Sequence, residues 1–210
     1  MNVEELVKEL KAVANPDDAV AMRAYMRNKF DFLGVKTPAR RKLSKAFFKQ
    51  QTDSVIDWDF INEAWSNPYR ESQYIALDYL EIRKKLLTPS DLPRLKKLAQ
   101  TKSWWDTIDF LDRLVGSIIT RFPETKEIIL AWSCDEDFWL RRLAIDHQLL
   151  RKEETDTELL EKILVNNLDQ TEFFINKAIG WALRDYSKTN PDWVRDFIER
   201  HQAEMVALSI

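Results

Sequence analysis

The chain has 210 residues, of which 45% are apolar and 32% are charged, the balance of a folded protein with a sizeable core. Its net charge is −3, and one cysteine with two histidines is too few for a disulfide or a zinc site. The first ten residues carry acids instead of a basic signal-peptide start, and no run approaches the roughly 18 apolar residues of a membrane span. We therefore expect a cytoplasmic protein, in a bacterium associated with the nucleoid, with no cofactor, metal or membrane contact.

Helix signals recur along the chain. It has three glycines, and Thr37-Pro38 and Asn190-Pro191 each combine an N-cap residue with a proline in the first turn. Apolar periodicity between such signals predicts an all-α fold of about a dozen helices. The predicted helices span residues 3–13, 17–30, 38–50, 57–66, 69–86, 91–101, 103–121, 124–133, 137–151, 156–167, 171–187 and 191–202.

The longer helices repeat with a fixed period. The triplets that begin at Ala76, Phe110, Ala144 and Ala178 lie 34 residues apart, and a bulky or acidic residue stands five positions before each of them. Such a period of helix pairs is typical of a solenoid. Tetratricopeptide units share the length, but their small-residue consensus is missing. We predict one domain over 1–210, an α-solenoid of HEAT-like helix pairs with a concave face.

The charge is unevenly distributed. Residues 21–50 contain nine Lys or Arg and one acid, a local charge of +8, so the remaining residues carry −11. This segregation allows a positive surface on a protein of acidic pI, although a solvated basic face would give the same pattern.

The stretch TKSWWDTID places acids beside large aromatic rings. Trp105 and Asp109 are four residues apart on one predicted helix and face the same way. In the repeat overlay, Asp109 and Arg142 each occupy a position that is apolar in at least one other repeat. Two interpretations stay open: a functional acid beside an indole, or a salt bridge between Asp109 and Arg142 on neighbouring helices.

The segments AYMRNKFDFLGVKTPARR, TKSWWDTID, FWLRRLAI and EFFINKAIGWALRDYSKTNP resemble the HEAT-like bacterial alkylpurine DNA glycosylases of the AlkD type, and the likeness covers nearly the whole chain. The resemblance implies hydrolysis of the N-glycosidic bond of cationic alkylpurines, such as 7-methylguanine and 3-methyladenine, in duplex DNA without base flipping. It assigns the active-site acid to Asp109, the active-site tryptophans to Trp105 and Trp181, and a phosphate-holding arginine to Arg142. Tyr25 matches a tyrosine on a helix that approaches the minor groove.

Polar and basic residues around these positions are expected to reach backbone phosphates. Together they would form a DNA-binding groove on a monomeric protein. The candidates are Thr37, Arg40, Arg41, Lys102, Ser103, Lys177, Arg184 and Lys188. A metal site formed by Asp106, Asp109 and Asp112 is not expected, since helical drift separates them. Four further tryptophans are assigned to the core: Trp104, Trp132, Trp139 and Trp193.

Two features depart from the resemblance. The chain ends at EMVALSI, where relatives continue through a further basic helix, and its balance is acidic. The main alternative is therefore a HEAT-like protein that binds damaged or branched DNA without catalysis. A third interpretation is a helical scaffold that presents its surface to protein partners.

Overall fold

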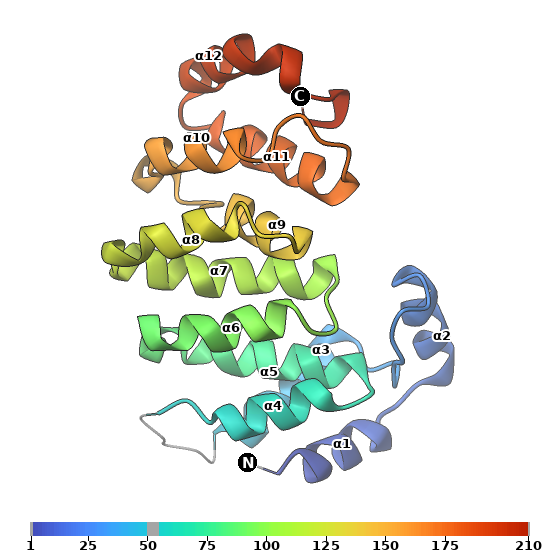
Figure 1. Cartoon of the computed structure of the whole chain (residues 1–210). Helices are drawn as coiled ribbons and strands as arrows, with labels where there is room; N and C mark the ends of the chain where they lie inside the picture. Colours follow the sequence, from blue (N-terminus) through green and yellow to red (C-terminus); the bar gives the residue numbers. More distant parts are fainter. Residues whose placement is uncertain (1, 50–54, 210) are drawn as a thin grey trace. The chain divides into compact units, whose positions relative to one another are not determined.

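A computed structural model describes residues 2–49 and 55–209, and these residues are helical apart from connecting segments (Figure 1). Within that part of the chain there is no strand, and an isolated bridge joins Asp31 to Tyr69. The chain divides into two compact units, Met1–Leu87 and Thr88–Ile210. The single domain over 1–210 stays a prediction.

Among its described residues, the first unit contains five α-helices and a short 3-10 turn. They are α1 (Val3–Ala12), α2 (Pro16–Tyr25), α3 (Thr37–Phe48), α4 (Trp58–Ser66), α5 (Arg70–Ile82) and η1 (Lys84–Leu86). Helices α1, α3, α4 and α5 pack on one another around buried side chains such as Leu10, Phe60 and Tyr79. In contrast, α2 buries none of its side chains, so it adds little to this core.

Glu71, in the first turn of α5, anchors the segment that precedes α3. Its buried carboxylate accepts hydrogen bonds from the backbone N–H groups of Leu33, Gly34 and Val35 at 3.0, 2.9 and 3.1 Å. Gly34 has a φ of 81°, and a Cβ there would lie 2.0 Å from the carbonyl oxygen of Asn15. The close approach of this segment to the start of α2 therefore requires a glycine.

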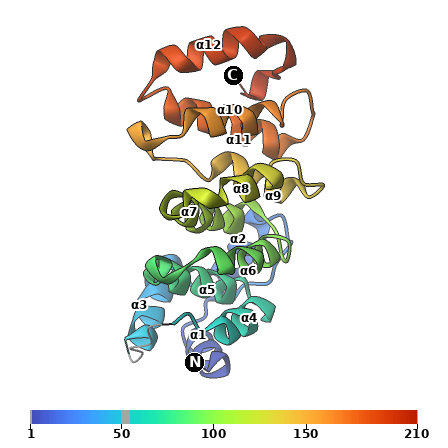
Figure 2. The same cartoon turned by 60° about the vertical axis from the view of Figure 1, so that its left-hand side comes forward.

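The second unit is a stack of helices that follow one another along the chain (Figures 1 and 2). Neighbouring members pack in turn, α6 on α7, α7 on α9, α8 on α10 and α9 on α11. Its elements are η2 (Pro89–Asp91), α6 (Leu92–Ala99), α7 (Trp105–Arg121), η3 (Pro123–Thr125), α8 (Lys126–Trp132), α9 (Phe138–Asp146), η4 (Lys152–Glu154), α10 (Thr157–Val165), α11 (Phe173–Tyr186), α12 (Pro191–His201), η5 (Gln202–Glu204) and η6 (Ala207–Ser209).

The all-α prediction is confirmed, and the stacked pairs of the second unit are consistent with an α-solenoid. Each predicted helix coincides with an observed one; the predicted end of the third helix at residue 50 lies outside the described residues. The largest differences are at the predicted 17–30 and 137–151 helices, which end five residues early, at Tyr25 and Asp146, each before a turn. Among the described residues, no helix is long and apolar enough to cross a bilayer.

The 34-residue register corresponds to equivalent positions of the packed helices. The first position of the register holds a buried alanine in three repeats, Ala76, Ala144 and Ala178, and the half-buried Phe110 in the fourth. Two residues later the register places a buried acid in three repeats, Asp78, Asp112 and Asp146. A repeated buried carboxylate is unusual in a helix core, because each one needs a partner or a proton.

Candidate active site

An aromatic cluster holds the beginnings of α7, α9 and α11 together. Trp104 lies 5.7 Å from Trp139 and 5.3 Å from Phe174 between ring centroids, and Trp139 lies 4.8 Å from Phe174. Asp137 and Glu172 cap α9 and α11 by accepting the N–H groups of Trp139 and Phe174. Side chains from the first turns of these three helices are therefore presented from fixed starting points.

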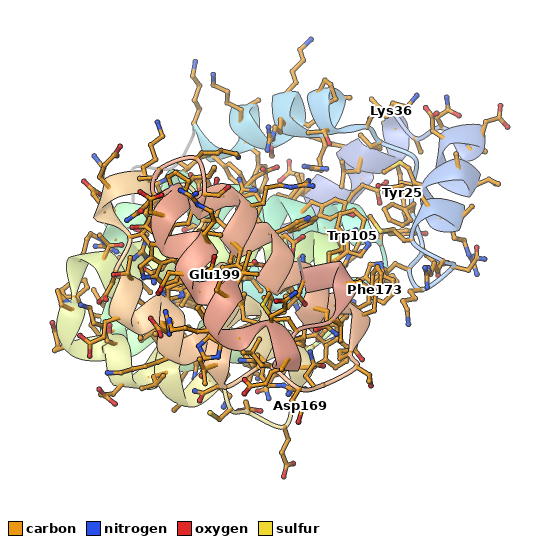
Figure 3. The ribbon with its side chains drawn as sticks, turned by 90° about the horizontal axis from the view of Figure 1, so that it is seen from above. Tyr25, Lys36, Trp105, Asp169, Phe173 and Glu199 are labelled. Atoms are coloured by element: carbon orange, nitrogen blue, oxygen red, sulfur yellow. The ribbon has the colours of Figure 1, made fainter. Side chains whose placement is uncertain are left out.

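Trp105 and Asp109 lie one turn apart on α7 and are both half-buried. The Asp109 side chain keeps 20% of its surface exposed, which leaves the carboxylate partly accessible to solvent. Seen from above, Trp105 and Phe173 lie on the same side of the second unit, which brings the start of α11 to the side of α7 that carries Trp105 (Figure 3).

Arg142 of α9 forms a two-pronged contact with Asp109. Its Nε donates to Oδ1 at 2.8 Å and its Nη2 to Oδ2 at 2.9 Å, while Nη1 donates to the carbonyl oxygen of Phe174 at 2.8 Å. The arginine side chain is 1% exposed. The salt bridge that the sequence left as an alternative is therefore present, and it fixes both oxygens of Asp109.

The buried position of Arg142 disfavours the phosphate contact expected for it. Three of its nitrogens already donate to Asp109 and Phe174, and a phosphate would have to displace one of these partners. That contact stays a prediction for the DNA-bound state.

Trp181 of α11 completes the aromatic surroundings of the pair. The Arg142 guanidinium carbon lies 5.0 Å from the Trp181 ring centroid, and the Lys177 ammonium nitrogen lies 5.4 Å from it. The indole is 37% exposed, so part of it stays open to a ligand. These cations already interact with the ring, and a bound cation would compete with them for its electron-rich face.

Burial raises the pKa of Asp109 above its ordinary value, and the attraction of Arg142 opposes this shift. A carboxylate in such a partly dry setting interacts more strongly with positive charge than one in water does. Because both oxygens are held in place, it can stabilise a cation or orient a water molecule without first reorganising.

Two further acids surround this pair, and the sequence reasoning did not assign them to the site. Asp112 lies three residues after Asp109, and Asp146 lies four residues after Arg142; both are 2% exposed. The signal that could have found them is the register, which places an acid at the same position in three repeats. Without coordinates, nothing distinguished a buried acid from an exposed one on a helix.

The predicted phosphate ligands of the second unit occupy different environments. Arg184 and Lys188 are exposed on or directly after α11, and the Lys188 ammonium lies 3.4 Å from Asp185. Lys102 and Ser103 are half-buried before α7, and the Ser103 hydroxyl donates to the carbonyl of Ala99 at 2.6 Å. Their accessibility is compatible with DNA contacts, which stay predictions.

In the first unit, the exposed candidates are Tyr25, at 70% exposure on α2, and Thr37, at the start of α3. Arg41 is 60% exposed and lies 3.3 Å from Asp78. Arg40 is 6% exposed, faces the same carboxylate at 3.4 Å, and burial lowers its pKa. Its burial disfavours the predicted phosphate contact and makes it the internal partner of Asp78.

The four tryptophans that the sequence assigned to the core differ in burial. Trp104, Trp132 and Trp139 are buried, and Trp193 is half-buried against Phe197. The described residues hold no group of three or more His, Cys, Asp or Glu side chains that could bind a metal ion.

The profile of the family described as DNA alkylation repair enzyme matches residues 6–210. The chain belongs to this family. A solved structure described as a predicted DNA alkylation repair enzyme from Enterococcus faecalis is similar to this member of the family, with a TM-score of 0.85 and 33% sequence identity. The match covers 93% of this chain and 92% of that one. Among curated proteins, none matches the chain.

In this member of the DNA alkylation repair enzymes, the candidate active site lies in the second unit. Asp109, Arg142 and Trp181 lie in one connected set of contacts there, and Trp105 lies one turn from Asp109.

Proposed function

We propose that this DNA alkylation repair protein is a monofunctional DNA glycosylase that releases cationic alkylpurines, such as 7-methylguanine and 3-methyladenine, from duplex DNA. It would act as a monomer, without flipping the base. The observation that carries the proposal is the partly exposed Asp109 carboxylate held by Arg142, in a chain of this family. Trp105 lies one turn away on α7, and the Trp181 ring lies against the Arg142 guanidinium.

The proposed reaction requires little acid catalysis. An N3- or N7-alkylated purine is already positively charged, so the bond from its nitrogen to C1′ breaks with the electron pair leaving on the base. The sugar becomes an oxocarbenium-like cation, which a carboxylate at its open face stabilises. Water then forms the new bond to C1′ and gives up a proton to Asp109 or to solvent, which leaves a free base and an abasic site.

The neighbouring side chains would shape this event. Trp105 and Trp181 would pack against the sugar and backbone and exclude water, which strengthens the field of Asp109. Arg142 would keep the carboxylate oxygens aligned before substrate arrives, so its alignment costs little at the moment of reaction. The exposed basic residues Arg41, Arg184 and Lys188 would hold phosphates.

A second function is favoured by the same ion pair. Arg142 neutralises much of the charge of Asp109, as expected for a purely structural pair in a protein that binds damaged or branched DNA without cutting the glycosidic bond.

Incubation with methylated duplex DNA, followed by chromatography of the soluble bases, separates the two functions. The glycosylase releases 7-methylguanine or 3-methyladenine above the rate of spontaneous loss. Retention of DNA by the protein with spontaneous release alone would select the non-catalytic function.

A further inference from the structure

The structure surrounds one buried cation with three carboxylates. Arg142 is paired with Asp109, its Nη2 lies 3.6 Å from an oxygen of Asp146, and Asp112 is close enough to influence Asp146 electrostatically. If all three acids were ionised, the cluster would carry a net charge of −2 in a region from which water is largely excluded. Burying an unpaired carboxylate is costly, and such a group takes up a proton instead.

The hydrogen bonds show which acids lack a partner. Asp109 receives two charged donors, whereas within the described chain neither oxygen of Asp146 has a hydrogen-bond partner, and the same holds for Oδ1 of Asp112. The nearest cation of Asp112 is Arg113, with Nε at 4.0 Å, and the side chain of that arginine is 64% exposed. A distant and exposed cation compensates little for a buried charge.

The equivalent repeat position in the first unit provides an internal comparison. Asp78 faces two arginines, Arg40 and Arg41, at 3.4 and 3.3 Å, and thus has cations of its own. At the same register position, Asp146 has to share Arg142 with Asp109, and the arginine beside Asp112 is the exposed Arg113 at 4.0 Å. The scaffold therefore carries a paired acid in one unit and two poorly paired acids beside the candidate active site.

We propose that the carboxyl groups of Asp112 and Asp146 are protonated, and therefore neutral, in the folded protein near neutral pH, so that Arg142 pairs with Asp109 alone. Both acids are then positioning residues that do not touch substrate. Because they are neutral, Arg142 is not divided between Asp109 and Asp146, and the negative charge of the cluster lies on Asp109. Ionisation of either acid, with loss of its proton to solvent, would add negative charge behind Asp109 and weaken the hold of Arg142 on it.

The surrounding charges agree with this assignment. Burial, followed by the repulsion of Asp109, raises the pKa of Asp112 to about 8, while the charge and the backbone N–H of Arg113 and the charge of Arg142 act in the opposite direction. Burial raises the pKa of Asp146 well above its ordinary value; Arg142 opposes this shift, and Asp112 and Asp109 add to it. These groups come from α7 and α9, which pack directly on each other.

The protonation states can be measured without any activity. In wild-type protein labelled with ¹³C at the aspartate carboxyl groups, NMR should show two carboxyl signals that are still protonated at pH 6.5, and the signal of Asp112 should titrate between pH 7 and 9. Asp112→Asn and Asp146→Asn assign the signals, and the exposed Asp192→Asn, which should leave both in place, is the control. If every aspartate of the wild-type protein has already ionised at pH 6.5, the inference is overturned, even if a variant fails to fold.

The consequence for reactivity rests on the proposed function and has its own readout. The single-turnover rate of the wild type on a duplex with one 7-methylguanine, divided by the rate of Asp112→Asn at the same pH, should fall at least about threefold from pH 6.5 to pH 9, because ionised Asp112 weakens the hold of Arg142 on Asp109. A ratio that stays constant or rises over this range would refute the positioning role, whereas failure of every form to release base would reject the glycosylase function and leave the NMR result standing.

Discussion

Asp109→Asn separates the chemical role of the acid from its structural one. The amide keeps the size of the side chain and can still accept a hydrogen bond from Arg142, but it removes the negative charge. Loss of one preorganised electrostatic contact lowers an enzymatic rate by roughly 10²–10³-fold. Because cationic alkylpurines are labile on their own, we expect the lower half of this range, about 100- to 300-fold in the single-turnover rate. Affinity for lesion DNA should change little, since the interaction belongs to the transition state.

The same substitution has a calculable effect on stability. Removing one member of a buried ion pair typically costs about 3–5 kcal/mol, because the other charge is left without a partner. Here Asp146 lies 3.6 Å from Arg142 and can ionise to replace Asp109, so we expect a smaller loss, about 2 kcal/mol in urea unfolding.

Rates should be normalised to the folded fraction, with Asp106→Asn, one turn earlier on α7, as the matched control. A folded Asp109→Asn protein that releases base at the wild-type rate would refute the catalytic role and leave Asp109 a structural ion-pair partner.

Further substitutions test the other contacts. Arg142→Lys cannot make the two-pronged contact, so the single-turnover rate should fall about tenfold or more while DNA affinity stays within about threefold; an equal fall in affinity would instead support the phosphate contact. Trp181→Ala should weaken both binding and rate, because packing on the sugar exists before bond breaking, and loss of rate alone would contradict this. Duplex binding should weaken steeply between 50 and 200 mM salt, roughly 10-fold or more, if the basic residues of 21–50 contact phosphates; a salt-independent affinity would exclude that role. The pKa of Asp112 is about 8 in the folded protein and close to its ordinary value of 3.8 in the unfolded chain, so the folded state binds the extra proton between these values. From pH 5 to pH 8.5 the free energy of unfolding of the wild type should therefore fall by at least about 2 kcal/mol relative to that of Asp112→Asn. Equal pH dependence of the two proteins in urea unfolding would show that Asp112 is ionised.

The sequence was sufficient for the helices because their boundaries carry local signals. The N-cap of α12 at Asn190 and the proline after it lie where the pattern placed them. The sequence predicts that Thr37 caps α3, but it is already the first residue of that helix, whose N-cap is Lys36. The repeat register, with its period of 34 residues, placed Asp109 and Arg142 near each other on neighbouring helices, and their salt bridge was one of the two interpretations left open. Local pattern and register are both readable from one chain.

Burial within the site could not be read in the same way. The sequence presented Arg40 and Arg41 as equivalent basic residues, but one turns inward to Asp78 and the other stays exposed. The repeat register marks Asp112 and Asp146 as equivalent positions, but it does not show that they lie inside the helix stack beside Arg142. Whether a charged side chain on a helix is internal depends on which face meets its neighbour, and that is a property of the packed structure.

The glycosylase proposal is tested most directly by counting both products from one substrate. A duplex with a single 7-methylguanine is incubated with excess protein, and the free base and the abasic sites are quantified by mass spectrometry against a protein-free control. The account predicts equal amounts of free 7-methylguanine and abasic sites, formed well above the spontaneous rate and reduced about 100-fold or more in Asp109→Asn. Tight binding of the duplex with neither product above the control would contradict it.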